Sequence, residues 1–255
     1  MRILMIGDVI GKPGRRAVRS LLPGIRAERG IDLVIANGEN TAGGFGLTQE
    51  TAYELLESGV DVITSGNHIW DQKEIIPHME EGLPLIRPAN YPDAPGRGYL
   101  IAQGVMVINL MGRVFMPALD CPFRTASRIL EETHDLAPKV IIVDFHAEAT
   151  SEKQAMGWYL DGRVSAVLGT HTHVGTVDAR VLTKGTGYLT DVGMTGPIDS
   201  VIGSETSAVL ERFLTGMPHR LPVAGGQVVM NSVLIDVDPE TGKALSVERI
   251  DKAEN

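Results

Sequence analysis

The sequence predicts an α/β protein in which two β-sheets pack face to face. Three observations support this prediction. Apolar runs alternate with helical segments through residues 1–68, a rhythm typical of parallel βαβ units with helices on the sheet faces. Two late runs flank the turn sequence "PETGK" (239–243), which indicates an antiparallel hairpin. No linker or internal repeat divides the 255 residues, so we expect a single domain over 1–255.

The first half of the chain repeats one pattern three times. An apolar run ends at a glycine followed by polar residues, which predicts a buried strand and a sharp turn. Helical segments rich in charged residues, Ala and Leu separate the runs, and Thr48 is well placed to cap the second one. The predicted strands are 2–8, 31–40 and 60–68, and the predicted helices are 14–29, despite Pro23, and 48–57.

The second half is less regular and mixes short strands with single helices. Turn residues separate the early strands, and the last two long runs have the alternation of antiparallel strands. We expect strands at 83–90, 98–103, 105–110, 139–146, 164–173, 227–238 and 244–250, and helices near 122–134 and 151–160.

Bulk composition excludes several classes of protein. The formal net charge is −9 and no basic block occurs, which argues against long nucleic acid or an anionic membrane as a partner. The single cysteine, Cys121, excludes an internal disulfide and a thiolate zinc site. No run reaches about 18 apolar residues, so we expect a cytoplasmic protein without a membrane span.

Polar side chains that bind metals follow five of the predicted strands. In open parallel sheets, functional groups gather where the carboxyl ends of the strands meet, so we expect these residues to converge. If the strand runs to 173, alternation would put His171 and His173 on one side of it. Each cluster alone is more often a turn, a helix cap or a hydrogen-bonded histidine. The candidates are Asp8, Glu39, Asn40, Asn67, His68, His146, His171 and His173.

The chemistry of these side chains predicts a site for two metal ions. Oxygen and imidazole ligands without thiolate suit iron, manganese or zinc. Seven candidate ligands (all of the above except His68) are too many for one ion. Two ions roughly 3.5–4 Å apart, sharing one bridging carboxylate, would use them all. Such a centre would attract an anionic ligand despite the acidic protein around it.

Longer motifs make the chain similar to a known family. The motifs "GDVIG", "GEN", "GNH" and "GTHTHV" occur in an order that resembles the calcineurin-like metallophosphoesterases. The stretches "IANGENTAGGFGLT", "DFHAEATSEKQAMGW" and "LTDVGMTGP" resemble its YmdB-like branch over nearly the whole chain. The resemblance implies the calcineurin-like metallophosphoesterase fold, a sandwich of two mixed sheets flanked by helices. It also implies hydrolysis of 2′,3′- and 3′,5′-cyclic nucleotides at a di-iron centre.

The resemblance also implies a role for each candidate residue. Asp8, Glu39, Asn40 and His173 would bind one metal. Glu39 would bridge to a second metal completed by Asn67, His146 and His171. A hydroxide bridging the two metals would attack phosphorus, and His68 would protonate the leaving alkoxide as general acid.

The first motif departs from the wider superfamily. The usual Asp-x-His is here Asp8-Val9-Ile10, and Asn40 would replace the missing histidine. Because an amide replaces an imidazole, the metal cannot be inferred from the superfamily; iron is expected, with manganese or zinc as alternatives.

Some interpretations stay open on sequence alone. The same centre could serve a phosphomonoesterase or nuclease, or a regulatory protein that keeps the metal site without catalysis. An amidohydrolase also uses His-x-His, but near the start of its barrel. Phe45 is a candidate to stack on a base, and Arg124 could contact phosphate or another subunit of a homo-oligomer.

Overall fold

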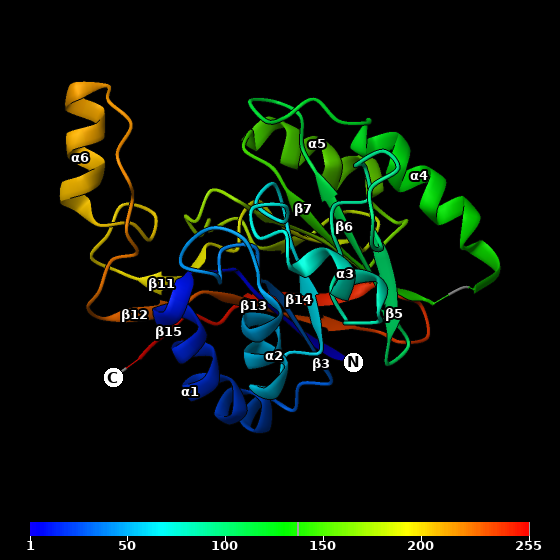
Figure 1. Ribbon diagram of the computed structural model, residues 1–255. Helices are drawn as coiled ribbons and strands as arrows, with labels where there is room; N and C mark the ends of the chain where they lie inside the picture. Colours follow the sequence, from blue (N-terminus) through cyan, green and yellow to red (C-terminus); the bar gives the residue numbers. More distant parts are fainter. Residues whose placement is uncertain (137, 255) are drawn as a thin grey trace.

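The computed structural model describes residues 1–136 and 138–254 and contains two mixed β-sheets packed face to face (Figure 1). In the first sheet β1, β3 and β4 are parallel, β13 pairs antiparallel with β1, and β14 pairs antiparallel with β13. Its order is β14 (Ala244–Arg249), β13 (Ser232–Val237), β1 (Arg2–Ile6), β3 (Leu33–Asn37) and β4 (Val62–Thr64).

The second sheet has four parallel strands between two antiparallel edge strands. Its order is β5 (Tyr99–Ala102), β6 (Val105–Met111), β7 (Val140–His146), β8 (Ala166–Thr170), β10 (Gly187–Leu189) and β9 (Arg180–Val181). The predicted mixed sandwich is therefore confirmed.

Strand alternation divides the apolar side chains among three layers of core. On β1, Ile3 and Met5 face the second sheet and pack in one cluster with residues such as Val107 of β6. Leu4 and Ile6 face the opposite way, against α1 (Gly11–Arg29) and α2 (Gln49–Glu57). The outer face of the second sheet packs on α4 (Pro122–Glu132) and α5 (Thr150–Leu160). Figure 1 shows the two pairs of helices on opposite sides of the sheets.

A smaller third sheet was not expected. Its order is β15 (Lys252–Ala253), β12 (Val228–Met230), β11 (Met194–Pro197) and β2 (Asp8–Val9). It continues the first sheet beyond Ile6 and Ser232, where β11 inserts between β2 and β12. The predicted strand 227–238 is therefore split at Asn231, because its two halves pair with different neighbours.

Most predicted elements are found, and the exceptions have identifiable causes. Thr48 caps α2 as expected, in a capping box with Thr51. Residues 83–90 form only isolated bridges instead of a strand, and they include two prolines that cannot donate to a sheet. The strand predicted over 164–173 ends at Thr170, so alternation does not place His171 and His173.

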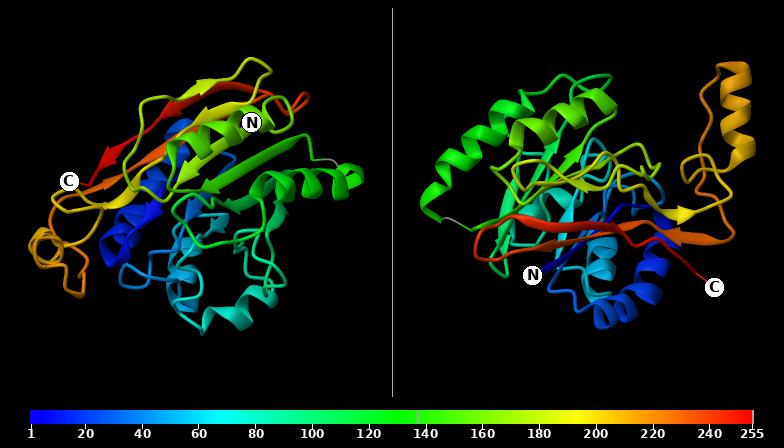
Figure 2. Two further views of the ribbon diagram at one scale, coloured as in Figure 1. Left: turned by 90° about the horizontal axis from the view of Figure 1, so that it is seen from above. Right: turned by 180° about the vertical axis from the view of Figure 1, so that it is seen from behind.

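Three helical elements of the described residues had no counterpart in the prediction: α3 (Ile75–Glu80), the 3₁₀ turn His134–Leu136 and α6 (Thr206–Thr215). Helix α6 stands apart from the layers (Figures 1 and 2) and buries only Val209. Within the described residues, no helix combines the length and the apolar character needed to cross a membrane.

Candidate metal centre

The candidate ligands lie at the carboxyl ends of parallel strands from both main sheets. Glu39 and Asn40 follow β3, Asn67 follows β4, and His146 is the last residue of β7. Asp8 follows β1, and His171 and His173 follow β8. The parallel strands within each sheet end at the same edge, and the face-to-face packing brings the two edges together.

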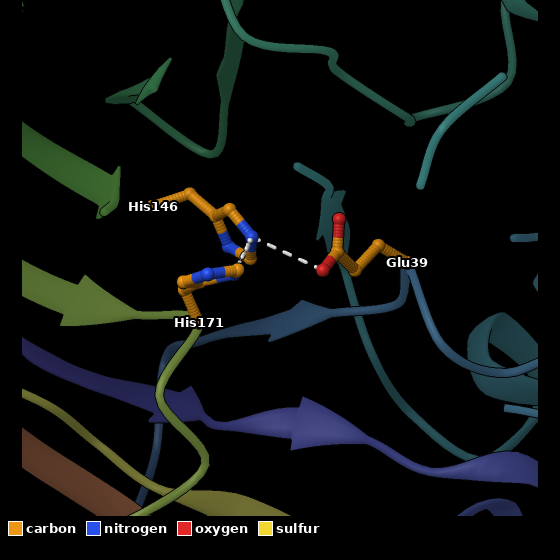
Figure 3. Close-up of side chains that lie close together, drawn as sticks. All are labelled: Glu39, His146 and His171. Carbon is orange, nitrogen blue, oxygen red and sulfur yellow. Dashed lines mark hydrogen bonds and ion pairs between the residues drawn. The ribbon is translucent and has the colours of Figure 1, made fainter. Parts of the chain in front are cut away.

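Three potential ligand atoms surround the Nε2 atom of His146. Glu39 Oε1 lies 3.0 Å away, His171 Nδ1 3.0 Å and Asn67 Oδ1 3.1 Å. Figure 3 shows the two histidine rings and the carboxylate turned toward one another. One imidazole nitrogen carries at most one proton, so it cannot donate to all three. A cation held among Glu39, His146 and His171 would satisfy these atoms together.

A second group of candidates is linked to Glu39 through Asn40. Asn40 Nδ2 is 3.4 Å from Glu39 Oε1 and 3.3 Å from His173 Nε2. His173 Nε2 is in turn 3.7 Å from Asp8 Oδ1. That carboxylate oxygen is fully buried and has no hydrogen-bond partner among the described residues. A buried unpaired carboxylate oxygen is costly, and a bound cation is the partner that its chemistry fits.

The charges of these side chains compensate one another. Burial opposes a charge on His146, but the adjacent Glu39 carboxylate outweighs it and raises the His146 pKa to about 9. Burial likewise opposes the charge on Glu39, yet His146 holds the Glu39 pKa at about 2. Burial and the charge on His146 lower the His171 pKa to about 3. His146 thus takes the place of a cation, and metal binding would displace its proton.

Gly66 allows His146 and Glu39 to lie close to the backbone that precedes Asn67. A Cβ atom at this position would lie 2.3 Å from the His146 ring and 2.4 Å from Glu39 Oε2. No real side chain fits at such distances. The glycine of "GNH" is therefore required by the site itself.

His68 lies at the edge of the centre with its backbone anchored to it. Its main-chain N–H donates to Glu39 Oε2 at 3.0 Å, and its Nδ1 is 2.8 Å from Asp71 Oδ2. The ring of Phe45 meets the His68 ring edge-on, with centroids 5.1 Å apart. Nε2 of His68 has no hydrogen-bond partner among the described residues and is free to meet a ligand.

A cavity of about 530 Å³ opens over these residues. Its polar floor includes Glu39, Asn40 and the three histidines 68, 171 and 173, and Phe45 lines it as well. The segment 198–223, which includes α6, forms a largely apolar wall of the cavity, and we call it the excursion 198–223. Val209 and Phe213 of α6 line this wall, and Arg212 adds one positive charge. Arg124 is not part of this cavity; it lines a separate hollow beside α4.

Sequence reasoning missed several residues at this site. Glu148 lines the cavity, and its Oε2 is 3.2 Å from His171 Nε2. Its position two residues after His146 was a usable signal. Arg212 and Phe213 gave no signal, because nothing in a lone amphipathic helix indicates which cavity it borders.

Comparisons with known proteins match nearly the whole chain. A family model described as "YmdB-like protein" matches residues 4–250. A "2′,3′-cyclic-nucleotide 2′-phosphodiesterase" of Bacillus subtilis (strain 168) is 50% identical over 255 residues, covering 98% of this chain and 96% of that protein.

Solved structures superpose over the whole chain. A hypothetical protein from Thermus thermophilus has a TM-score of 0.93 at 47% identity and covers 100% of both chains. A structure described as a novel phosphatase, from Mycoplasma pneumoniae, has a TM-score of 0.93 at 34% identity, covering 100% of this chain and 94% of that one. A 5′-nucleotidase precursor from Thermus thermophilus shares the fold alone, with a TM-score of 0.58 at 13% identity and coverage of 98% and 54%.

Proposed function

Because the chain belongs to the YmdB-like protein family, we propose that it is a phosphodiesterase that hydrolyses small cyclic nucleotides at a dinuclear metal centre. The observation that carries this proposal is the convergence of seven candidate ligands around Glu39, including a buried oxygen of Asp8 that has no partner among the described residues. The Bacillus subtilis relative supports a 2′,3′-cyclic nucleotide as substrate, and we extend the proposal to the 3′,5′ isomer.

The contacts sort the ligands into two sets that share Glu39. In one set His173 lies near Asp8 and Asn40. In the other set His146 contacts Asn67 and His171. We assign each set, with Glu39 as the bridge, to one metal. Two divalent cations, iron by preference and manganese or zinc as alternatives, would polarise phosphate oxygens and lower the pKa of a coordinated water.

His68 is assigned the role of general acid. The contact of Nδ1 with Asp71 orients the ring, which leaves Nε2 available to a ligand in the cavity. An alkoxide is a poor leaving group near neutral pH, so proton donation from Nε2 would assist its departure. Phe45, which borders both His68 and the cavity, is the proposed contact for the base, in preference to Arg124.

The same residues could act on phosphomonoesters, and the description of the Mycoplasma relative as a phosphatase favours this second candidate. A long nucleic acid fits less well, because the net charge is −9. A regulatory protein without catalysis would not need an acid at the position of His68.

We also propose a cytoplasmic homo-oligomer. Apolar side chains on α6 support self-association, since Phe213 and Leu214 are 80% and 84% exposed. Light scattering on the purified chain would measure the mass, and a monomer at micromolar concentration would contradict this part of the proposal.

The central experiment combines metal analysis with substrate profiling. Protein purified without oxygen should contain two metals per chain and prefer 2′,3′-cAMP over 2′-AMP and 3′-AMP. His173→Ala should lose one metal and most activity. His134→Ala, at an exposed site outside the cavity, should keep both metals and full activity. A preference for monoesters would support the phosphatase instead, and wild-type protein that binds no iron, manganese or zinc would exclude both.

A further inference from the structure

The backbone of the His171-Thr172-His173 turn is held in an unfavourable conformation. The φ angles are 99° at His171 and 65° at His173, in the left-handed region that side chains other than glycine rarely adopt. Such a conformation persists only where the surrounding contacts impose it. At His171 the backbone N–H donates to Asp8 Oδ2 at 3.1 Å. Further contacts to the turn come from two charged residues to which the centre gives no ligand role, Lys153 and Asp191.

Lys153 and Asp191 form a buried ion pair beneath the turn. Lys153 lies in α5 and is 1% exposed, and Asp191 follows β10 and is 0% exposed. The Lys153 ammonium donates to Asp191 Oδ2 and, at 2.8 Å, to the carbonyl oxygen of Thr170. The pair therefore reaches the last residue of β8, immediately before His171.

The Asp191 carboxylate holds the middle of the same turn. Its Oδ2 accepts from the backbone N–H of Thr172 at 3.2 Å and from the Thr172 hydroxyl at 2.8 Å. Its Oδ1 accepts from the N–H of Gly193 at 2.8 Å. Thr170 and Thr172, which alternate with the two histidines, are thus both bound to one ion pair.

Gly169 makes room for this arrangement. A Cβ atom there would lie 1.8 Å from the carbonyl oxygen of Thr190 and 3.1 Å from Lys153 Cδ. Its absence lets β8 approach the segment that carries Asp191 while the lysine stem passes alongside. The glycine, the lysine and the aspartate form one support, built from α5, β8 and the end of β10.

We propose that Lys153 and Asp191 are a positioning pair for the metal centre, which fixes the turn that aims His171 and His173 at the two metals. This inference rests on the proposed function. Neither residue lines the cavity, so neither is a catalytic residue. They act through Thr170 and Thr172, and supports of this kind typically contribute 10- to 100-fold in metal affinity.

The test is Mn²⁺ affinity, measured by calorimetry on the full chain. Removing one partner would leave a buried charge uncompensated and could unfold the protein, so the main variant is Lys153→Met/Asp191→Asn, which removes both charges. It should bind Mn²⁺ roughly 10- to 100-fold more weakly than the wild type. Saturating Mn²⁺ should restore most of its hydrolysis of 2′,3′-cAMP, because the pair does not touch the substrate.

The matched control is Asp161→Asn. Asp161 is also a buried carboxylate, 4% exposed, and it also holds a turn through the N–H groups of Lys184 and Thr186. It makes no contact with the candidate ligands. A purely structural role for Lys153 and Asp191 predicts that both variants lose stability and neither loses Mn²⁺ affinity. Positioning predicts that only the double variant loses affinity.

Each outcome of the Mn²⁺ measurement either supports or overturns the positioning role. If the folded double variant binds Mn²⁺ as tightly as the wild type, the inference is overturned. If it does not fold, Thr172→Val decides, because it removes only the hydroxyl bond to Asp191 and should weaken Mn²⁺ binding in the same direction by a smaller factor. Wild-type protein that binds no metal would instead overturn the proposed function.

Discussion

Replacing His68 with alanine separates proton donation from metal binding. The main-chain N–H of His68, not its side chain, anchors Glu39, so the substitution leaves that 3.0 Å bond in place. The side chain contributes an edge contact to Phe45 and an interaction with Asp71, and it is 29% exposed. An aromatic contact of this kind is worth about 0.5–1.5 kcal/mol. The variant should therefore fold and keep both metals.

The expected loss of turnover depends on the leaving group. A general acid contributes typically 10²- to 10⁴-fold, which is about 2.7–5.4 kcal/mol at 1.36 kcal/mol per factor of ten. Turnover of 2′,3′-cAMP, which expels a ribose alkoxide, should fall by about that factor. Turnover of bis(p-nitrophenyl) phosphate should fall by less than about tenfold, because a nitrophenolate leaves without a proton.

Steady-state kinetics with both substrates, alongside metal analysis, measures this difference. His78→Ala is the matched control. His78 also pairs through Nδ1 with an acid three residues later, Glu81, at 2.9 Å and with 26% of its side chain exposed, but it lies outside the cavity. The control should keep both activities. Equal losses of the two activities in His68→Ala, with metal content intact, would refute the acid role.

Three further predictions follow from the same geometry. Gly66→Ala should displace His146 and lower metal occupancy measured by mass spectrometry, whereas Gly24→Ala, with nothing within 4 Å of its added Cβ, should keep full occupancy. Phe45→Ala should raise KM for 2′,3′-cAMP by up to roughly tenfold with kcat nearly unchanged, and Phe45→Leu should do so less; unchanged KM in both would exclude base contact. Removing metals with a chelator should abolish hydrolysis. It should also lower the melting temperature by about 5–11 °C relative to protein at a free metal concentration of 100 times the Kd, because metal binding then stabilises the fold by about 2.7 kcal/mol. A melting temperature that does not respond to metal would contradict a site in the folded core.

The position of the candidate centre could be predicted because it follows from chain topology. Each polar residue was identified at the end of an apolar run, and parallel strands bring such ends to a common edge. Glu39 after β3 and His146 at the end of β7 are the clearest cases. This reasoning needs no side-chain detail, so errors of a few residues in several strand boundaries do not affect it.

The conformation of the histidine turn could not be predicted in the same way. Alternation on a continued strand does not account for the placement of His171 and His173 in the cavity lining, since both lie beyond β8 with left-handed backbone. Two of the residues that hold this turn, Lys153 and Asp191, each lie 18 residues from the nearer histidine. No local pattern shows that a lysine in one helix and an aspartate after a later strand will meet.

The contribution of α6 to the cavity wall could not be predicted from the sequence for a related reason. This wall bears most directly on the choice of substrate. Helix α6 has an apolar stripe but buries only Val209 of it, so the pattern that normally identifies a helix packed on a core does not show its place here. Its other apolar side chains are exposed or face the cavity, where Phe213 and Val209 stand opposite a floor of carboxylate, amide and imidazole groups. A site of about 530 Å³ with one charged and one apolar side suits a ligand that itself has a phosphate at one end and a flat apolar group at the other. A phosphate ester without a base would fill only the floor, so the excursion 198–223 should favour nucleotides over simple esters through KM more than through kcat.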